Sequence, residues 1–329
     1  MSLEFLISKI QKNNFLLIGR AGVDIYPDPP GTKTENANTY VTHLGGSSAN
    51  MGVQLSKYGG SCSLLTRVSN DALGKFVLKQ LDYYNVNKDL VKLEDNESRI
   101  SLAIVETTVE DHQSIIYRHK AADLFLNKTD IESANIENYE CILITGTSLA
   151  AEPSRSSVLF AIELAKENKI PVIMDIDYRP YTWESADKAK KIYNLAVKNC
   201  SGIIGNDDEF AVLSGNYEES LDYAKKLASD CDLVIYKMGE KGSITYANNK
   251  EIVKGIFPVK PLKPTGAGDA FMGSLIGALL KNYDLEKAIE IGSAAAAIVV
   301  TKVGCAPAMP NLEEVLEFMT TNKINEGEK

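Results

Sequence analysis

The chain has 329 residues, of which 44% are hydrophobic and 24% charged, and its formal net charge at pH 7 is -9. This apolar content excludes global disorder and supports a large core, either one α/β domain with a small appendage or two domains. The acidic balance and the dispersed Lys and Arg argue against a nucleic-acid-binding surface. An anionic ligand would therefore need a local site built from helix N-termini, backbone amides and a few cations.

The cysteines and the apolar runs indicate where the protein acts. The five cysteines are odd in number and contain no CxxC pair, so neither a disulfide framework nor a zinc site is indicated. No segment approaches the roughly 18 apolar residues of a membrane span, and the N-terminus lacks a signal-peptide pattern. We expect a cytoplasmic protein with reduced thiols and no membrane partner. The cysteines are Cys62, Cys141, Cys200, Cys231 and Cys305.

Short apolar runs alternate with amphipathic stretches along most of the chain, which predicts a mostly parallel sheet covered by helices. The runs that predict buried strands are 15–18, 63–66, 141–144, 172–174, 203–204 and 233–236. The stretches with helical periodicity are 48–58, 73–85, 155–168, 186–199, 220–228, 269–281 and 285–301.

Two segments, 23–42 and 100–117, break this rhythm. The second alternates through Ile100, Leu102 and Ile104 and then passes a polar turn at 110–113, as strands do. We predict that both segments lie outside the main sheet. A small antiparallel flap over one sheet edge and two separate surface hairpins both fit the pattern.

Polar residues follow the predicted strands, at 19–24, 145–147, 175–179, 206–209 and 237–239. In an open parallel sheet, ligands bind beyond the carboxyl ends of the strands. We therefore expect these residues to form a polar cleft at one sheet edge.

The sharpest local motif is Thr265-Gly266-Ala267-Gly268-Asp269 at the start of a predicted helix. Small residues let backbone amides approach a phosphate, and the helix directs its positive end at developing charge. Asp269 could accept the proton of an attacking hydroxyl. We expect its pKa to be low, but positioning and charge stabilisation outweigh base strength in the loose transition state of phosphoryl transfer. The alternative is that Asp269 only caps the helix.

A second glycine cluster, Gly45-Gly46-Ser47-Ser48-Ala49-Asn50, begins another predicted helix. Backbone close to a polyol, with Asn50 as donor and acceptor, is one interpretation, and a loop-to-helix cap is the other. The chain contains neither GxxxxGK[ST] nor GxGxxG. His43, His112 and His119 have no metal-ligand or triad spacing.

These two clusters, in this order, resemble the two signatures of the ribokinase, or PfkB-type, carbohydrate kinase family, and the resemblance spans nearly the whole chain. Within the family the chain is most similar to the branch that phosphorylates the terminal hydroxyl of 5-dehydro-2-deoxy-D-gluconate in inositol catabolism. The motifs that carry this similarity are Gly19-Arg20 with Val23-Asp24-Ile25-Tyr26, Tyr117-Arg118 with Ala122-Asp123-Leu124, Asp175-Ile176-Asp177-Tyr178-Arg179-Pro180 with Trp183, and Gly304-Cys305-Ala306-Pro307-Ala308-Met309-Pro310.

The resemblance implies a Rossmann-like three-layer αβα fold with a mostly parallel central sheet and a small β-sheet lid. Residues 1–329 would form one kinase domain, with lid segments at about 23–42 and 100–117. ATP and Mg²⁺ would be required, and two copies would form a homodimer through their lids. Lys263-Pro264 stands where the family commonly has Asp-Thr, so a monovalent-cation site that depends on this Asp is left open.

The resemblance also implies roles for individual residues. Asp269 would be the catalytic base, and the anion hole would be formed by Gly266, Ala267 and Gly268. The residues that would hold the sugar are Asp24, Gly45, Gly46 and Asn50.

A sugar acid carries a carboxylate that Arg can bind through two hydrogen bonds. Arg118, beside Tyr117 on the predicted lid, is our candidate for this contact, and Arg179 would lie near substrate or phosphate. A surface salt bridge is the alternative for either arginine.

Asn206 and Glu209 match the family's N-x-x-E element, which would make Glu209 an indirect organiser of Mg²⁺; a helix start with a capping Asn is the alternative. Lys237 would reach ATP phosphates or be a solvated strand end. The other residues that would border the nucleotide are Gly239, Gly242 and Ser293.

Three other functions remain to be weighed. A 2-keto-3-deoxygluconate kinase or a fructokinase would use the same machinery on another sugar. A noncatalytic sensor of sugar or nucleotide could share the fold, because fold alone does not establish activity. An oxidoreductase is disfavoured because the dinucleotide fingerprint is absent.

Overall fold

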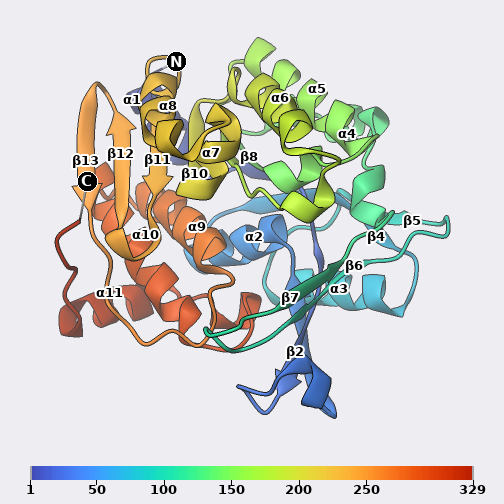
Figure 1. The fold of residues 1–329 in the computed structure, drawn as a ribbon. Helices are drawn as coiled ribbons and strands as arrows, with labels where there is room; N and C mark the ends of the chain where they lie inside the picture. The colour runs from blue at the N-terminus through green and yellow to red at the C-terminus, as the bar shows by residue number, and fades with distance from the viewer. Residues whose placement is uncertain (1, 328–329) are drawn as a thin grey trace.

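The computed structural model describes residues 2–327, and its centre is one nine-stranded sheet (Figure 1). The strand order is β13-β12-β11-β10-β9-β8-β1-β4-β5, and all six predicted strands are confirmed within it. Pairing is parallel from β11 to β5, and β12 and β13 add an antiparallel edge that the sequence analysis did not predict. The strands are β1 (Phe15–Ile18), β4 (Cys62–Ser69), β5 (Val91–Glu94), β8 (Cys141–Thr145), β9 (Val172–Asp175), β10 (Gly202–Asn206), β11 (Leu233–Lys237), β12 (Ser243–Ala247) and β13 (Lys250–Lys254).

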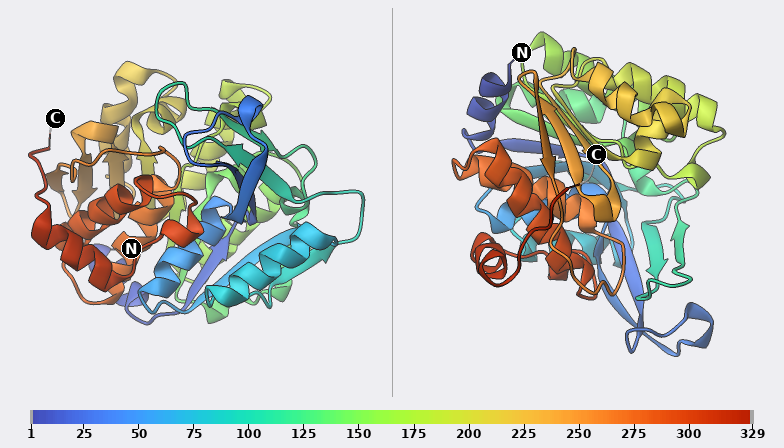
Figure 2. Two further views of the ribbon diagram at one scale, coloured as in Figure 1. Left: turned by 90° about the horizontal axis from the view of Figure 1, so that it is seen from below. Right: turned by 60° about the vertical axis from the view of Figure 1, so that its left-hand side comes forward.

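Helices cover both faces of this sheet (Figure 2). The pleat of β1 sends Phe15 and Leu17 into the core on one face and Leu16 and Ile18 into the core on the other. The fold class is therefore confirmed as three αβα layers. One face carries α1 (Leu3–Ile10), α2 (Ser47–Lys57), α3 (Ala72–Tyr83), α9 (Ala267–Leu280), α10 (Leu285–Val300) and α11 (Leu312–Thr321). The other carries α4 (Lys128–Ser133), α5 (Ser154–Glu167), α6 (Ala186–Val197), α7 (Asp207–Ser214) and α8 (Ser220–Leu227).

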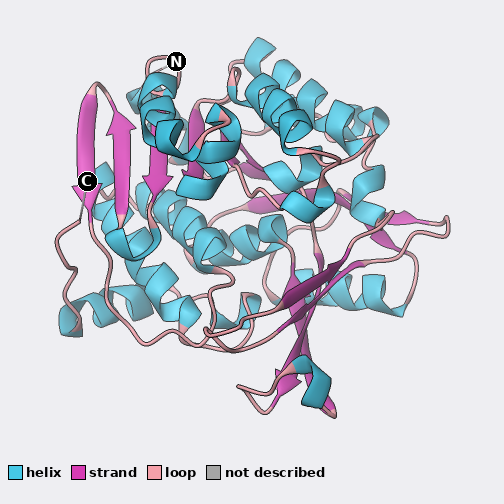
Figure 3. Ribbon diagram, viewed as in Figure 1, coloured by secondary structure: helices cyan, strands magenta, loops and turns pink. Residues whose placement is uncertain are grey.

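Four further strands form a small separate sheet, which we call the lid sheet (Figure 3). Its order is β3-β2-β6-β7, so the two irregular segments pair with each other, and the alternative of two separate hairpins is wrong. Its strands β2 and β6 are parallel, so the sheet is mixed rather than antiparallel as predicted. The strands are β2 (Gly22–Asp28), β3 (Thr39–Gly45), β6 (Ser101–Val105) and β7 (Ser114–Tyr117).

A buried carboxylate ties the two hairpins of the lid sheet together. Glu106 accepts hydrogen bonds from the backbone N–H of Thr34 at 2.8 Å and of Gln113 at 3.3 Å. Its Oε2 also lies 3.2 Å from the Lys33 ammonium. Because the β2–β3 loop and the β6–β7 loop share this one side chain, their tips are held side by side.

Two expectations about the whole chain can be compared with the structure. Among residues 2–327, no helix combines the length and the apolar character that crossing a bilayer requires. All five cysteines are free and buried, which agrees with the expected reduced thiols.

Candidate active site

The carboxyl ends of the parallel strands meet where the sequence order of the main sheet reverses, on the two sides of β1. Open α/β sheets bind ligands at such a switch point. Asp175 ends β9, Asn206 ends β10 and Lys237 ends β11, so three neighbouring strands deliver polar side chains to one edge. Arg20 follows β1 and Thr147 follows β8 at the same edge. The predicted polar cleft is built from these strand ends.

The helix α9 presents an open N-terminus to this cleft. Gly266 is its N-cap residue in the left-handed conformation, with φ of 87°, and no side chain caps the helix. Among residues 2–327, the amides of Ala267, Gly268 and Asp269 have no hydrogen-bond partner. Free amides at a helix N-terminus favour an anion. Asp269 lies in the first turn without capping it, contrary to the capping alternative.

Asn50, from α2, contacts Asp269 directly. Its Nδ2 donates to Asp269 Oδ2 at 2.9 Å, and its own Oδ1 is buried without a partner in the described chain. Burial and the charge of Asp177 raise the pKa of Asp269 to about 8, although the Asn50 hydrogen bond opposes the shift. The expected low pKa is wrong because burial disfavours the charged carboxylate and the nearby carboxylates of Asp177 and Asp175 add to this effect. The raised value brings Asp269 near the range in which a general base works at neutral pH.

The predicted sugar residues form a tight corner between the lid sheet and α2. Asp24, on β2, accepts a hydrogen bond from Tyr26 Oη at 3.4 Å, while its Oδ1 has no partner within residues 2–327. A Cβ at Gly45 would lie 2.0 Å from that Oδ1, and one at Gly46 would lie 2.5 Å from the Arg20 carbonyl oxygen. The unpaired oxygens of Asp24 and Asn50 are acceptors that a polyol could satisfy.

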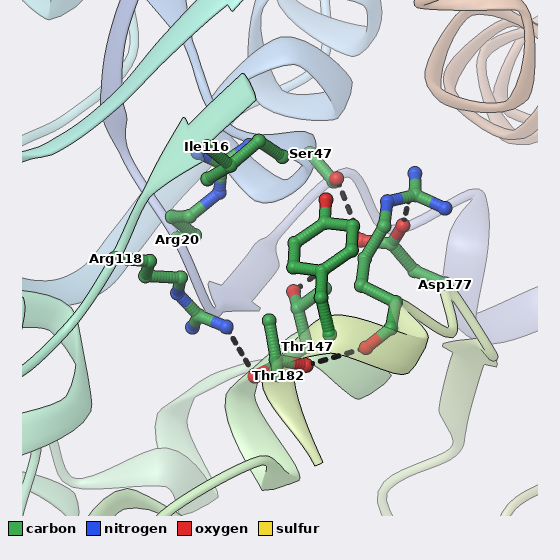
Figure 4. A pocket seen from close by; sticks show the side chains of 9 residues that line it. Arg20, Ser47, Ile116, Arg118, Thr147, Asp177 and Thr182 are labelled. Carbon is green, nitrogen blue, oxygen red and sulfur yellow. Dashed lines mark hydrogen bonds and ion pairs between the residues drawn. The ribbon is translucent and has the colours of Figure 1, made fainter. Parts of the chain in front are cut away.

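Asp177 links its own loop after β9 to the start of α2 and to the loop after β8, and the sequence analysis did not select it as a site residue. Its Oδ1 lies 2.6 Å from Arg179 Nη2. Its Oδ2 accepts from Ser47 Oγ at 2.7 Å and from Thr147 Oγ1 at 3.3 Å (Figure 4). The available signal was its place two residues after a buried strand that itself ends in Asp175.

Arg118 lies between two hollows beneath the lid sheet. Its guanidinium is buried, forms an ion pair with Asp123 and donates to the Thr147 carbonyl oxygen at 2.9 Å. The ion pair between Arg118 and Asp123 is therefore buried, so the alternative of a surface salt bridge is wrong for Arg118. The first hollow is lined by Arg20, Ser47, Ile116, Arg118, Thr147, Asp177, Arg179, Tyr181 and Thr182. The second, of about 330 Å³, is lined by Arg99, Ile100, Ile116, Tyr117, Arg118, His119 and Ala121.

Tyr117 is not brought beside Asp24. Cross-strand pairing places Tyr117 opposite Leu102, whereas Asp24 pairs with Ala103, the next residue along β6. Successive residues of a strand point to opposite faces. Tyr117 therefore lies on the outer face of the lid sheet, with 59% of its surface exposed.

Lys237 points towards the start of α9. A Cβ at Gly268 would lie 3.4 Å from its Nζ, and the Asp175 carboxylate lies 3.8 Å away. Burial lowers the pKa of Lys237, but the carboxylates of Asp175 and Glu209 outweigh it and raise the pKa above its usual value. The side chain is thus a fixed cation beside the free amides of α9, and it is not a solvated strand end.

Asn206 and Glu209 form a reciprocal capping box at the start of α7. Asn206 Oδ1 accepts from the Glu209 amide at 2.8 Å, and Glu209 Oε2 accepts from the Asn206 amide at 2.7 Å. The alternative interpretation, in which Asn206 caps the start of a helix, is therefore confirmed. Burial, followed by the charge of Asp175, raises the pKa of Glu209 to about 7.

The described residues contain no site in which protein side chains alone would hold a metal ion. Within the described part of the chain, no group of three or more His, Cys, Asp or Glu side chains is arranged to bind an ion. Mg²⁺ is commonly held by one or two carboxylates together with substrate phosphates and water. Asp175 and Glu209, beside Lys237, are the carboxylates that fit such a shared arrangement.

The remaining residues predicted to contact nucleotide lie towards the antiparallel edge. Gly239 and Gly242, with φ of 59° and 94°, flank the turn between β11 and β12. Ser293, on α10, donates to the Gly255 carbonyl oxygen at 3.4 Å, just after β13. These three residues border the loops beyond β11 and β13, on the side of the cleft away from Asp24.

Comparison with known proteins identifies the family of this chain. The profile of the pfkB family carbohydrate kinases matches residues 12–312. A 5-dehydro-2-deoxygluconokinase from Photobacterium profundum is 35% identical over 94% of this chain and 95% of its own length, and one from Clostridium botulinum is 35% identical over 97% and 96%. A crystal structure of fructokinase from Vibrio cholerae with fructose, ADP and calcium has a TM-score of 0.81 at 26% identity, over 93% of this chain and 99% of that one. The chain belongs to the pfkB family of carbohydrate kinases and is a sugar kinase.

Proposed function

We propose that this kinase transfers a phosphoryl group from ATP to the terminal hydroxyl of 5-dehydro-2-deoxy-D-gluconate. The observation that carries the proposal is that Arg20, Arg118 and Arg179 line one hollow beneath the lid sheet. Asp24, which interacts electrostatically with Arg20, and Asn50, which contacts Asp269, carry the unpaired acceptor oxygens of the site. A substrate that is both a polyol and a carboxylate matches this combination of charges. Relatives with the corresponding activity in their names are 35% identical to the chain.

In this proposal Asp269 accepts the proton of the attacking hydroxyl. The sugar oxygen forms a bond to the γ-phosphorus as the bond between that phosphorus and the oxygen of departing ADP breaks. The free amides of Ala267 and Gly268, with the Lys237 ammonium, stabilise the charge on the transferred group. Mg²⁺, held through Asp175 or Glu209 together with the phosphates, would neutralise part of the phosphate charge.

Arg118 is proposed to bind the substrate carboxylate. Its three donor nitrogens already make bonds to Asp123 and Thr147, so a second carboxylate would have to share the guanidinium with Asp123. Arg offers five N–H donors, which is enough for both partners. A neutral sugar would leave this arrangement unchanged.

An ADP-release assay tests the proposal directly. The substrates are 5-dehydro-2-deoxygluconate, 2-keto-3-deoxygluconate, fructose and ribose, each with MgATP. We expect a preference of about 100-fold for the first, which corresponds to roughly 2.7 kcal/mol of transition-state binding. Asp269→Asn removes the base, and Asp222→Asn makes the same change on the exposed face of α8 as the matched control.

The alternatives give different results in the same assay. A preference for 2-keto-3-deoxygluconate or fructose would keep the kinase and change its substrate; the likeness to the Vibrio cholerae fructokinase is the observation that favours fructose. Binding of sugar and ATP without turnover above the Asp269→Asn level would make the chain a noncatalytic sensor.

We also propose a cytoplasmic homodimer formed through the lid sheets. The register places Tyr40, Ile115 and Tyr117 on one outer face, and they are exposed by 42%, 38% and 59%. A second copy is an occupant that would cover this apolar face. Sedimentation should give a dimer for the wild type and a monomer for Ile115→Lys. A monomeric wild type at micromolar concentration would refute the dimer.

A further inference from the structure

Lys263 is a fully buried lysine that the proposed mechanism does not use. Its exposed surface is 0%, and its ammonium donates to the carbonyl oxygens of Thr265 at 2.6 Å and Val299 at 3.3 Å. Within residues 2–327 it forms no ion pair with a carboxylate. Burying an ammonium away from water and from a direct counterion is costly, so this placement requires a compensating interaction.

The hydrogen bond from Lys263 to the Val299 carbonyl oxygen offsets part of the cost of burying the ammonium. Val299 lies in the last turn of α10, where the helix dipole favours a cation. Its carbonyl oxygen also accepts from the backbone N–H of Lys302 at 3.2 Å. The next carbonyl, of Val300, accepts from the backbone N–H groups of Leu262 at 2.7 Å and Lys263 at 3.2 Å. Lys263 and its neighbour therefore cap the C-terminus of α10.

The second bond connects the ammonium to the anion hole. The Thr265 carbonyl belongs to the peptide whose N–H is that of Gly266, the residue that begins the free amides of α9. In a trans peptide the C=O and N–H point in opposite directions, so a cation on the oxygen polarises the N–H on the far side. This N–H has no hydrogen-bond partner in the described chain.

The charged groups around Lys263 belong to the same site. Burial lowers the pKa of Lys263, and the titratable groups that oppose this shift are Cys305, Asp24 and Asp269. Two of these are the proposed sugar ligand and the proposed base. The ammonium thus lies behind the anion hole, on the side away from the entering phosphoryl group, and is electrostatically coupled to both carboxylates.

We propose that Lys263 is a built-in cation that positions and polarises the anion hole, so that this kinase needs no monovalent metal ion there. The family resemblance allowed a monovalent-cation site that depends on an Asp before the Thr-Gly-Ala-Gly-Asp motif. The residues present do not fit such an ion, because a lysine takes the place of the carboxylate and its ammonium occupies the two carbonyl oxygens. This inference rests on the proposed phosphoryl transfer.

The first test uses the unmodified enzyme. Turnover is measured in KCl and in tetramethylammonium chloride at equal ionic strength, because tetramethylammonium is too large for a buried cation site. Equal rates are expected. Several-fold activation by K⁺ would overturn the proposal and requires no variant.

The second test compares two replacements. Lys263→Met fills the space with a neutral side chain, whereas Lys263→Ala leaves a cavity lined by the Thr265 and Val299 carbonyl oxygens. We expect both to lower kcat by roughly 10- to 100-fold, less than the loss of a whole oxyanion-hole donor, with the KM for sugar unchanged. K⁺ or NH₄⁺ should restore part of the rate of the alanine variant only.

A measurement without turnover separates this inference from the kinase assignment. The melting temperature of Lys263→Ala should rise with NH₄⁺ or K⁺ relative to tetramethylammonium, while that of Lys263→Met should not, because a ligand that binds only the folded state stabilises it. This shift would appear even if the sugar substrate were wrong. The proposal would be overturned if both variants had a lower melting temperature, an unchanged kcat and no cation-specific effect. Lys263 would then be only a structural cap of α10.

Discussion

Replacement of Gly45 by alanine should displace the Asp24 carboxylate without touching the nucleotide side of the cleft. The new Cβ would lie 2.0 Å from Asp24 Oδ1, 2.3 Å from Cγ and 2.6 Å from Oδ2. Real Cβ contacts are not found below 3.0 Å, so the carboxylate has to withdraw by about 1 Å. Asp24 is 5% exposed, and the surrounding core leaves it little room to do so.

The expected loss follows from the hydrogen bond that Asp24 would offer to the sugar. A hydrogen bond to a charged group contributes about 1.5–3 kcal/mol, which is roughly 10- to 150-fold in kcat/KM. A misplacement of about 1 Å in an active site has a cost of the same order. Overpacking should also lower the free energy of unfolding by about 1–3 kcal/mol.

The assay is steady-state kinetics with each substrate varied in turn, together with urea unfolding. For Gly45→Ala the KM for sugar should rise while the KM for ATP stays within about twofold. The matched control is Gly202→Ala in β10, where the Cβ would meet Ile173 Cγ2 at 3.1 Å, far from the sugar corner. It should lose stability and keep both KM values. An unchanged sugar KM in Gly45→Ala, with Asp24 displaced, would refute the role of Asp24.

Three other changes test the remaining parts of the site. The pKa of Asp269 is raised from 3.8 to about 8, so kcat/KM should rise with pH up to about 8. Ionisation of Asp269 lowers the stability of the fold as the pH rises from 3.8 to about 8. Asp269→Asn should therefore raise the melting temperature more at pH 9 than at pH 5. Lys237→Met removes the cation beside the Asp175 carboxylate and should raise the KM for ATP by about 10-fold, with the sugar KM as the internal control; an unchanged KM for ATP would remove Lys237 from the nucleotide site. Arg118→Ala should weaken kcat/KM for the sugar acid by about 1.5–3 kcal/mol and leave fructose unaffected, and equal losses on both would contradict the carboxylate assignment.

The parallel part of the sheet was predictable from sequence because buried strands are continuous apolar runs. All four residues of β1 are buried, whereas β13 is a polar edge strand whose pattern resembles a loop. The pairing of β2 with β6 was not predictable, since partners 79 residues apart leave no local signal. Asp24 pairs with Ala103 and Ile25 with Ile104 in register, across a stretch of chain that folds elsewhere.

Within the site, the sequence identified residues with distinctive motifs and missed what depends on several elements together. Asp269, its free amides and Asn50 were predicted and lie together. The pKa of Asp269 was predicted with the wrong sign because it depends on Asp177 and on burial, neither of which a motif records. Asp177 itself was overlooked because two of its partners, Ser47 and Thr147, come from distant segments of the chain.

The hydrogen bond between Asn50 and Asp269 also joins the proton affinity of Asp269 to the placement of the lid sheet. Asn50 lies in the first turns of α2, which begins directly after β3 of the lid sheet, and its amide favours the ionised form of Asp269. A lid position that shifts α2 must therefore change the free energy of protonating the base. By thermodynamic reciprocity, protonation would then shift the position of the lid sheet with the same free energy. A movement of this kind and the protonation of the base would then form one coupled equilibrium, in which pH would act as an effector of conformation.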